Sequence, residues 1–317
     1  MAELQKNSLQ QSRSSVWQRE LRRLRQNKYL LSMLLPALAY YVVFHYLPMY
    51  GVTIAFKNFN FKKGILGSDW AGLVHFEKLF NMPSFWKVFR NTFIISFYKL
   101  IFTFPAPIIF AVLINEIGGN RFKKTVQTIS YLPHFLSWVV LGGMFIQILS
   151  PVYGPINLIL GKLGIKPIHF LADTSTFRSV LVVTTIWKGI GWGSVIYLAA
   201  LTGIDPELYE AAELDGANRL QKTLHISIPS ILPIVSIQLI FAVGGIVNDD
   251  FDQVFNLYNT SVYSVGDVLS TYIHRYGLVN FEYSLSTAAG VFKNIIAFVL
   301  IIATNYASRC MGDYGIW

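Results

Sequence analysis

The chain has 317 residues, of which 53% are hydrophobic and 14% are charged. Soluble domains carry roughly one-quarter charged residues, so this composition excludes an ordinary soluble domain and indicates a protein that lies mostly in lipid. The single cysteine, Cys310, excludes an intramolecular disulfide and a cysteine-based metal cluster.

Residues 1–28 form a basic segment, which accounts for part of the formal net charge of +9. A basic run can bind nucleic acid, but a long apolar run follows at once, so the positive-inside rule favours a solvated cytoplasmic segment and no nucleic-acid partner. The apolar run exceeds the roughly 7–15 residues of a signal-peptide core. We therefore expect it to remain as a membrane anchor.

Six apolar stretches reach the length of about 20 residues that a membrane-spanning helix needs. They predict an all-α fold, with a six-helix transmembrane domain over residues 29–307 and a tail over 308–317. The loops near 57–90, 150–176 and 248–284 have room for short helices only. Pro36, Pro105 and Pro107 are interpreted as packing kinks within spans. The expected spans lie near Tyr29–Phe56, Thr92–Asn115, Val126–Leu149, Phe177–Leu201, Pro229–Val247 and Leu285–Ala307.

Loop charges predict the orientation of these spans. The basic residues of the short loops fall on the same side as the N-terminal segment, and this side is assigned to the cytoplasm. The basic loop near 57–90 weakens the argument without reversing it. An even number of spans places both termini in the cytoplasm, so we expect a multi-pass protein of the cell membrane. The loop charges that decide this are Arg121, Lys123, Lys124, Arg219, Lys222 and Arg309.

The local structure of the loop at 205–227 can be predicted from its residues. Asp205 suits a helix N-cap, Pro206 suits the first helical position, and Gly216 supplies the conformational freedom that ends a helix. We expect two short helices here, near Glu207–Asp215 and Ala217–Ile226.

Acidic residues of the first short helix share one face. Glu207, Glu210 and Glu213 recur at every third position, whereas Leu208 and the two small residues Ala211 and Ala212 lie towards another face. Such a helix suits docking into a groove of a partner protein, and it equally suits a solvated connector between two spans. Local physics leaves both interpretations open.

The order and spacing of the loop residues resemble the EAA loop of binding-protein-dependent ABC importer permeases. Nearby segments resemble narrower groups: WKGIGWGSVIYLAALTGIDPELYEAA the carbohydrate-uptake branch, and FHYLPMYGVTIAFKNF a subgroup that imports oligosaccharides derived from complex polysaccharides. The resemblance extends over nearly the whole chain from about Tyr29. The loop residues that carry it are Glu210-Ala211-Ala212, Asp215-Gly216-Ala217, Ile228-Pro229 and Leu232-Pro233.

The resemblance implies the ABC type I importer permease fold, with a coupling helix that docks in a cleft of a cytoplasmic ABC ATPase dimer. ATP would close that dimer and tilt the spans from inward-open to outward-open. Because the chain has one coupling loop and the dimer has two clefts, a second permease subunit is implied, together with an external solute-binding protein and an oligosaccharide substrate. The implied ATPase-coupling residues are Glu207, Glu210, Ala211, Ala212, Asp215 and Gly216.

Motifs for catalysis do not occur in the sequence. The phosphate-loop pattern G-x-x-x-x-G-K-[ST] is missing, as are H-E-x-x-H and C-x-x-C. We therefore expect no catalytic residue, no metal site and no cofactor in this chain, with ATP and Mg²⁺ held by the partner ATPase subunits. The alternatives are an ion-coupled secondary sugar transporter and a membrane scaffold. The expected spans contain no Asp or Glu, which disfavours proton coupling.

Lysines inside spans are candidates for the substrate path. Lys99 and Lys293 lie near enough to the expected span ends to snorkel to the interface. Lys188 lies deeper, between Trp187 and Trp192. Its partner is either a substrate carboxylate, as in a uronate-containing oligosaccharide, or a backbone carbonyl or an acidic group of the second subunit.

Position matching to the maltose branch, counted outward from the EAA loop, implies a substrate path on the two helices that flank the loop. Asp249 belongs to a polar cluster that is either a vestibule or the point where the helix meets water. The implied residues are Thr185, Lys188, Gly189 and Trp192 on one helix, and Ala242, Ile246 and Asp249 on the next.

Overall fold

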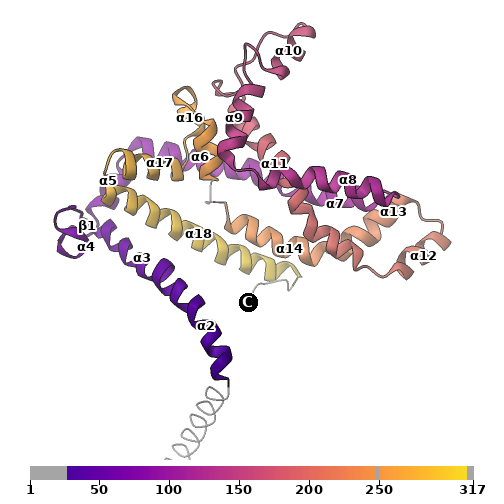
Figure 1. Ribbon diagram of the computed structural model, residues 1–317, viewed down its shortest axis with the longest axis horizontal. Coiled ribbons are helices and arrows are strands. Elements are labelled where there is room, and N and C mark those ends of the chain that lie inside the picture. The colour runs from indigo at the N-terminus through magenta and orange to yellow at the C-terminus, as the bar shows by residue number, and fades with distance from the viewer. Residues whose placement is uncertain (1–26, 247–249, 313–317) are drawn as a thin grey trace, which may run out of the picture.

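A computed structural model describes residues 27–246 and 250–312, and it consists of a body of long helices (Figure 1). Within the described residues, five helical stretches are long and apolar enough to cross a membrane. A sixth crossing is added if one strongly bent helix pair is a single span. The five stretches are Leu31–Phe56, Pro83–Asn115, Phe177–Thr202, Arg219–Gly244 and Tyr283–Tyr306.

Several spans consist of more than one helical element. The first joins α2, η1, α3 and η2, and the second joins α6 and α7 at the predicted Pro105 kink. The stretch Arg219–Gly244, which corresponds to the fifth of the six predicted spans, joins α13, η4 and α14. The bounds are α2 (Lys28–Tyr41), η1 (Val42–Tyr46), α3 (Leu47–Met49), η2 (Tyr50–Phe56), α6 (Pro83–Thr103), α7 (Pro105–Asn115), α11 (Phe177–Thr202), α13 (Arg219–Lys222), η4 (Thr223–Ser227), α14 (Ile228–Gly244) and α18 (Tyr283–Gly312).

The predicted all-α fold is confirmed, and two boundaries are corrected. The second span begins at Pro83 rather than near Thr92, because proline at the first position starts the helix before the strongly apolar run. The fifth span begins at Arg219 rather than near Pro229, since the second short helix of the loop continues through α13 and η4 into α14 without interruption. Pro229 has no backbone N–H to donate, and the π-helical turn η4 lies directly before it, where the hydrogen-bond pattern of the helix already changes. Val247, the expected end of the fifth span, lies outside the described residues.

The third predicted span is broken. In place of one helix near Val126–Leu149, the chain forms α8 (Asn120–Tyr131), η3 (Leu132–Phe135) and α9 (Trp138–Ile148), with a bend of 105° between the two parts. Leu136 and Ser137 are extended, and the Ser137 side chain accepts a hydrogen bond from the backbone of Val140 as the cap of α9. The prediction of one continuous helix was therefore wrong, because the chain stops and restarts the helix at this point.

The remaining elements are short and lie mostly at the end of the body opposite to α12 (Pro206–Leu214), except for α10, which extends from α9 (Figure 1). The predicted loops hold these short helices and one antiparallel pair of two-residue strands, in which Lys57 faces Trp70. The bounds are β1 (Lys57–Asn58), α4 (Gly64–Gly67), β2 (Asp69–Trp70), α5 (Val74–Phe80), α10 (Pro155–Lys162), α15 (Phe251–Leu257), η5 (Thr260–Val262), α16 (Tyr263–Gly266), α17 (Leu269–His274) and η6 (Arg275–Val279).

Three apolar clusters hold the body together. One packs α5, α6, α17 and α18 around Phe85 and Tyr272, and a second packs α6, α11 and α15 around Phe177. The third joins α7, α11 and α14 through Ala111, Tyr197 and neighbouring side chains. The helix α11 therefore contacts the spans before and after it, which places it at the centre of the fold.

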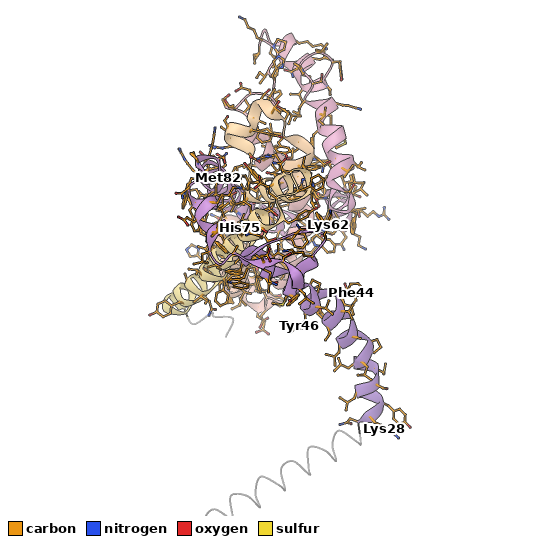
Figure 2. All side chains as sticks on the ribbon, turned by 90° about the vertical axis from the view of Figure 1, so that its left-hand side faces the viewer. Lys28, Phe44, Tyr46, Lys62, His75 and Met82 are labelled. Atoms are coloured by element: carbon orange, nitrogen blue, oxygen red, sulfur yellow. The ribbon has the colours of Figure 1, made fainter. Side chains whose placement is uncertain are left out.

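The first span stands apart from this body. Its most apolar part is 0% buried, and Figure 2 shows Lys28 at the far end of the helix with Phe44 and Tyr46 along its length. The helix joins the body near η2, which packs against α18. Most of its apolar side chains are therefore left for lipid or for another protein.

Candidate coupling helix and substrate cavity

The predicted short helix of the 205–227 loop is α12, and its caps are those expected from the sequence. The Asp205 carboxylate accepts a hydrogen bond of 3.0 Å from the backbone N–H of Glu207, and Pro206 occupies the first turn. Gly216 adopts a φ of +78°, a conformation that strains any residue with a Cβ atom. This local structure projects α12 from one end of the body (Figure 1).

Side chains of α12 are largely exposed, since none of its residues is buried. Glu207, Glu210 and Ala211 are exposed, whereas Ala212 is half-buried. Leu208 is 51% exposed and Leu214 is 90% exposed. The exposed side chains of Leu208 and Leu214 are available for contact with another protein. Leu214 was missed in the sequence interpretation, although its position at the end of the helix before Asp215 was a usable signal.

Two side-chain contacts tie α12 to the helix that follows. The Tyr209 hydroxyl lies 2.9 Å from the Ser227 hydroxyl, and Ser227 is 1% exposed. Lys222 donates a 2.5 Å hydrogen bond to Glu213, and this bond holds the pKa of the Glu213 carboxyl below its ordinary value. Glu213 is thus already paired within the chain, so the acidic face that α12 offers to a partner consists of Glu207 and Glu210.

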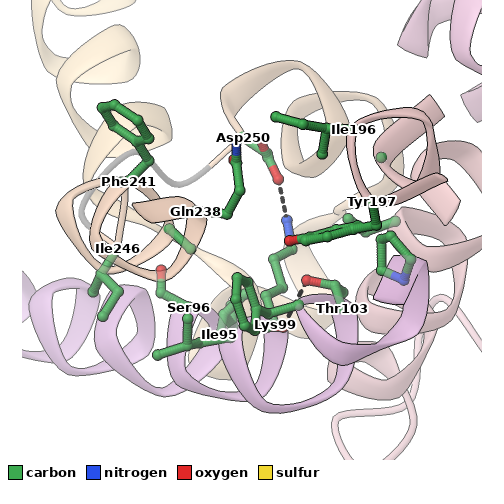
Figure 3. A pocket seen from close by; sticks show the side chains of 17 residues that line it. Ile95, Ser96, Lys99, Thr103, Ile196, Tyr197, Gln238, Phe241, Ile246 and Asp250 are labelled. Atoms are coloured by element: carbon green, nitrogen blue, oxygen red, sulfur yellow. Dashed lines mark hydrogen bonds and ion pairs between the residues drawn. The ribbon is translucent and has the colours of Figure 1, made fainter. Parts of the chain in front are cut away.

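A cavity of about 470 Å³ lies between α6, α7, α11 and α14 (Figure 3). Ligand sites in proteins typically have volumes of roughly 300–1,000 Å³. Its wall is mostly apolar, with Phe104 and Phe241 among the lining residues, and its polar groups include Ser96 and Gln238. Among the described residues that line it, Lys99 and Asp250 carry charge.

The lysine in this cavity is paired rather than snorkelled. The Lys99 Nζ atom lies 2.7 Å from Asp250 Oδ2 and 2.6 Å from Gln253 Oε1, and its side chain is 12% exposed. The snorkelling prediction was wrong because the second span begins at Pro83, earlier than expected, which places Lys99 near the middle of the span Pro83–Asn115. Lys293, for which snorkelling was also predicted, is half-buried and donates a 2.5 Å hydrogen bond to Ser270.

Part of the position-matched substrate path lines the cavity. Thr185, Ala242 and Ile246 belong to its wall, and the Thr185 hydroxyl donates a 3.0 Å hydrogen bond to Gln253. Gly189 is outside the lining, and a Cβ atom added to it would meet no atom within 4 Å. Asp249 lies outside the described residues.

Lys188 and Trp192 contact the break of the third span instead. Lys188 Nζ donates hydrogen bonds to the backbone carbonyls of His134, at 3.1 Å, and Leu136. The Trp192 ring stacks on His134 with 4.8 Å between ring centroids and an interplanar angle of 8°. Among the partners that the sequence left open for Lys188, the structure shows backbone carbonyls. No group of three metal-ligating side chains occurs among the described residues.

Comparison with known proteins supports the same architecture. The family described as "Binding-protein-dependent transport system inner membrane component" matches residues 103–251. The polygalacturonan/rhamnogalacturonan transport system permease protein YteP of Bacillus subtilis (strain 168) is 40% identical to this chain, over 94% of this chain and 93% of YteP.

Two solved structures are similar over most of the chain. One is a bacterial ABC transporter involved in the import of the acidic polysaccharide alginate, and the other is a bacterial alginate ABC transporter in complex with an alginate pentasaccharide-bound periplasmic protein. In each case the matched chain is 37% identical with a TM-score of 0.86, over 93% of this chain and 99% of the other. These relatives do not favour the secondary-transporter alternative. The chain therefore belongs to the family of binding-protein-dependent transport system inner membrane components and is a multi-pass permease subunit of an ABC transporter.

Proposed function

We propose that this chain is one of two permease subunits of an ATP-driven importer, and that its cargo consists of oligosaccharides, acidic ones included, released from polysaccharides. The proposal rests on one observation above all: the exposed helix α12 lies in the connection between α11 and α14, and both of these helices wall the cavity. The relatives named for polygalacturonan, rhamnogalacturonan and alginate support acidic cargo.

In this mechanism the cytoplasmic ATPase dimer holds ATP and Mg²⁺ and grips α12 through Glu210, Leu214 and the small residues between them. Displacement of α12 reaches the start of the fifth span through the Tyr209–Ser227 contact of 2.9 Å. It also reaches the second span, because Thr223 donates a 3.3 Å hydrogen bond to Glu116 at the end of α7. Both spans carry cavity residues, so movement of α12 alters the cavity walls.

The orientation of the chain in the membrane determines where the remaining partners bind. With α12 and both termini in the cytoplasm, the strand pair, α5 and α17 lie outside, where a cargo-loaded binding protein docks. A second permease supplies the second coupling helix and the opposite wall of the translocation path.

The test is ATP-dependent oligosaccharide uptake by the complete complex in proteoliposomes, with each partner omitted in turn. We expect uptake to require the ATPase, the second permease and the binding protein. Uptake by this chain without the ATPase, driven by an ion gradient, would contradict the proposal.

Substitutions on α12 test the coupling surface. Glu210→Lys and Leu214→Ser are expected to reduce ATPase attachment or to separate ATP hydrolysis from uptake, because a docked charge or leucine contributes about 1–3 kcal/mol. Leu163→Ser is the matched control, since Leu163 is 70% exposed in the chain segment after α10, away from α12. Wild-type assembly and uptake in both α12 variants would count against this surface.

A further inference from the structure

The Lys99–Asp250 ion pair joins a side chain that is largely buried to one that is half exposed. The Lys99 side chain is 12% exposed, whereas that of Asp250 is 49% exposed. Both line the cavity, and Figure 3 shows the Asp250 carboxylate approaching the ammonium group from the opposite wall. The lysine is therefore largely buried in the wall, whereas half of the aspartate side chain is open to solvent.

Gln253 fixes the lysine. Its side chain is 0% exposed, and its amide nitrogen donates hydrogen bonds of 2.8 Å to the Leu181 carbonyl and to the Thr184 hydroxyl. These bonds orient the amide so that its oxygen points at Lys99 Nζ, 2.6 Å away, and also accepts from Thr185. The ammonium group therefore keeps one neutral partner on α15 whatever happens to Asp250.

Asp250 is held much more weakly. It precedes α15 with a φ of +42°, in the left-handed region that is unfavourable for a residue with a Cβ atom. Within the described part of the chain, the Asp250 carboxylate makes a single hydrogen bond, the one that it accepts from Lys99. A half-exposed carboxylate with a single contact is exchanged at little cost, because water solvates it when it leaves.

We propose that Lys99 is a specificity-determining residue that binds a carboxylate of the cargo in the cavity, and that Asp250 occupies this position as an internal counter-ion when cargo is absent. This inference rests on the proposed function, because it assigns a residue that selects acidic oligosaccharides within that transporter.

The exchange keeps the charge of the cavity balanced. In the empty cavity the ammonium group is neutralised by Asp250. When a uronate residue enters, its carboxylate takes the same donor, Asp250 turns to solvent, and the count of charges buried against Lys99 is unchanged. A neutral sugar has no group that replaces the carboxylate, so the existing pair stays and the sugar contacts only the apolar and hydroxyl-bearing wall. The arrangement therefore favours acidic cargo without leaving a buried charge unpaired.

A double-mutant cycle with Lys99→Met and Asp250→Asn tests this assignment in the complete transporter complex. The measurements are thermal stability of the complex, and KM and maximal rate of uptake for a uronate oligosaccharide and for its carboxyl-reduced analogue of equal length. The same binding protein serves every variant, so each comparison with wild type cancels its own preference for either sugar.

We expect Lys99→Met to raise the KM for the uronate oligosaccharide by roughly ten- to a hundredfold, the loss of one charge-assisted hydrogen bond. The KM for the reduced analogue should change by less than about threefold. Asp250→Asn removes the internal competitor, so it should leave the KM for the acidic cargo unchanged or lower it. The double variant should behave like Lys99→Met alone.

A purely structural pair gives the opposite pattern. Both single variants would then lower stability and slow uptake of both sugars, and the double variant would recover stability; that outcome overturns the proposal. So does an unchanged acidic KM in Lys99→Met. Failure of the wild-type complex to import any oligosaccharide on ATP is a separate result, which contradicts the proposed function itself.

Discussion

Lysines within the spans of this protein have partners of quite different kinds. Lys99 is paired with a half-exposed carboxylate in a cavity, whereas Lys188 donates to backbone carbonyls at the break of the third span. A helix that ends inside a protein leaves carbonyls without helical partners, and in lipid these groups need another donor. Lys188 supplies that donor from the neighbouring helix α11.

Replacement of Lys188 by methionine is therefore expected to weaken the break and not the selection of cargo. Removal of the charged donor should lower the stability of the assembled complex by about 1–3 kcal/mol, because two carbonyls lose a charge-assisted partner. Thermal unfolding of the purified complex measures this effect, and Lys188→Arg, which retains donors and charge, is the matched control. Uptake of acidic and neutral oligosaccharides should fall by the same factor, so a selective loss of acidic uptake would contradict this role.

The positions of side chains along α11 could be predicted from the sequence, but the partners of those side chains could not. Thr185, which position matching assigns to the substrate path, lines the cavity, and its place along α11 is fixed by helix geometry. The partners of Lys188 and Lys99 come from segments more than fifty residues away in the chain. Nothing in the local pattern of either lysine distinguishes a carbonyl from a carboxylate.

At the scale of helices, the sequence predicted most reliably those features that depend on a few adjacent residues. The caps of α12 follow from Asp205, Pro206 and Gly216, and the structure has all three as expected. The 105° break of the third span was missed, and residues of α11 that are distant in sequence contact it. One of these contacts is a close crossing of α8 over α11 at Gly191.

The crossing at Gly191 is a position where backbones meet directly. A Cβ atom added to Gly191 would lie 2.2 Å from the carbonyl oxygen of Ser130, a distance that forces α8 away from α11. We expect Gly191→Ala to destabilise the complex by about 1–3 kcal/mol or more and to reduce uptake, as overpacking of rigid backbone does.

Gly189, on the same helix, provides the matched control. A Cβ atom there meets nothing within 4 Å, so Gly189→Ala should leave stability unchanged or raise it by up to about 1 kcal/mol through helix propensity. Thermal unfolding of both variant complexes, with uptake measured in parallel, makes the comparison. Equal stability of the two variants would show that the crossing yields more easily than its geometry implies.

At the scale of the whole molecule, the chain is a folded body with one span standing outside it. The body places α12 at one end and the strand pair, α5 and α17 at the other, with the cavity walled by the long helices between them (Figure 1). Hydrophobic patterning predicted the first span near Tyr29–Phe56, and the structure has it at Leu31–Phe56. It could not predict that this helix packs so little against its own chain, because an apolar helix suits lipid, a partner and its own protein equally.

We expect this first span to contact the second permease subunit. A span with 0% burial in its apolar part gains no packing from its own chain, and helices in lipid associate chiefly through packing against one another. The polar ring of His45 within this span also favours a protein neighbour over lipid.

A photo-crosslinking residue in place of Ala39, on the exposed helix α2, should couple this chain to a tagged second permease in the assembled complex. The same probe in place of Leu163, which is 70% exposed after α10, serves as the control for nonspecific coupling and should give a much weaker product. Labelling of lipid alone at position 39, in a complex that assembles and transports normally, would show that the helix faces the bilayer instead.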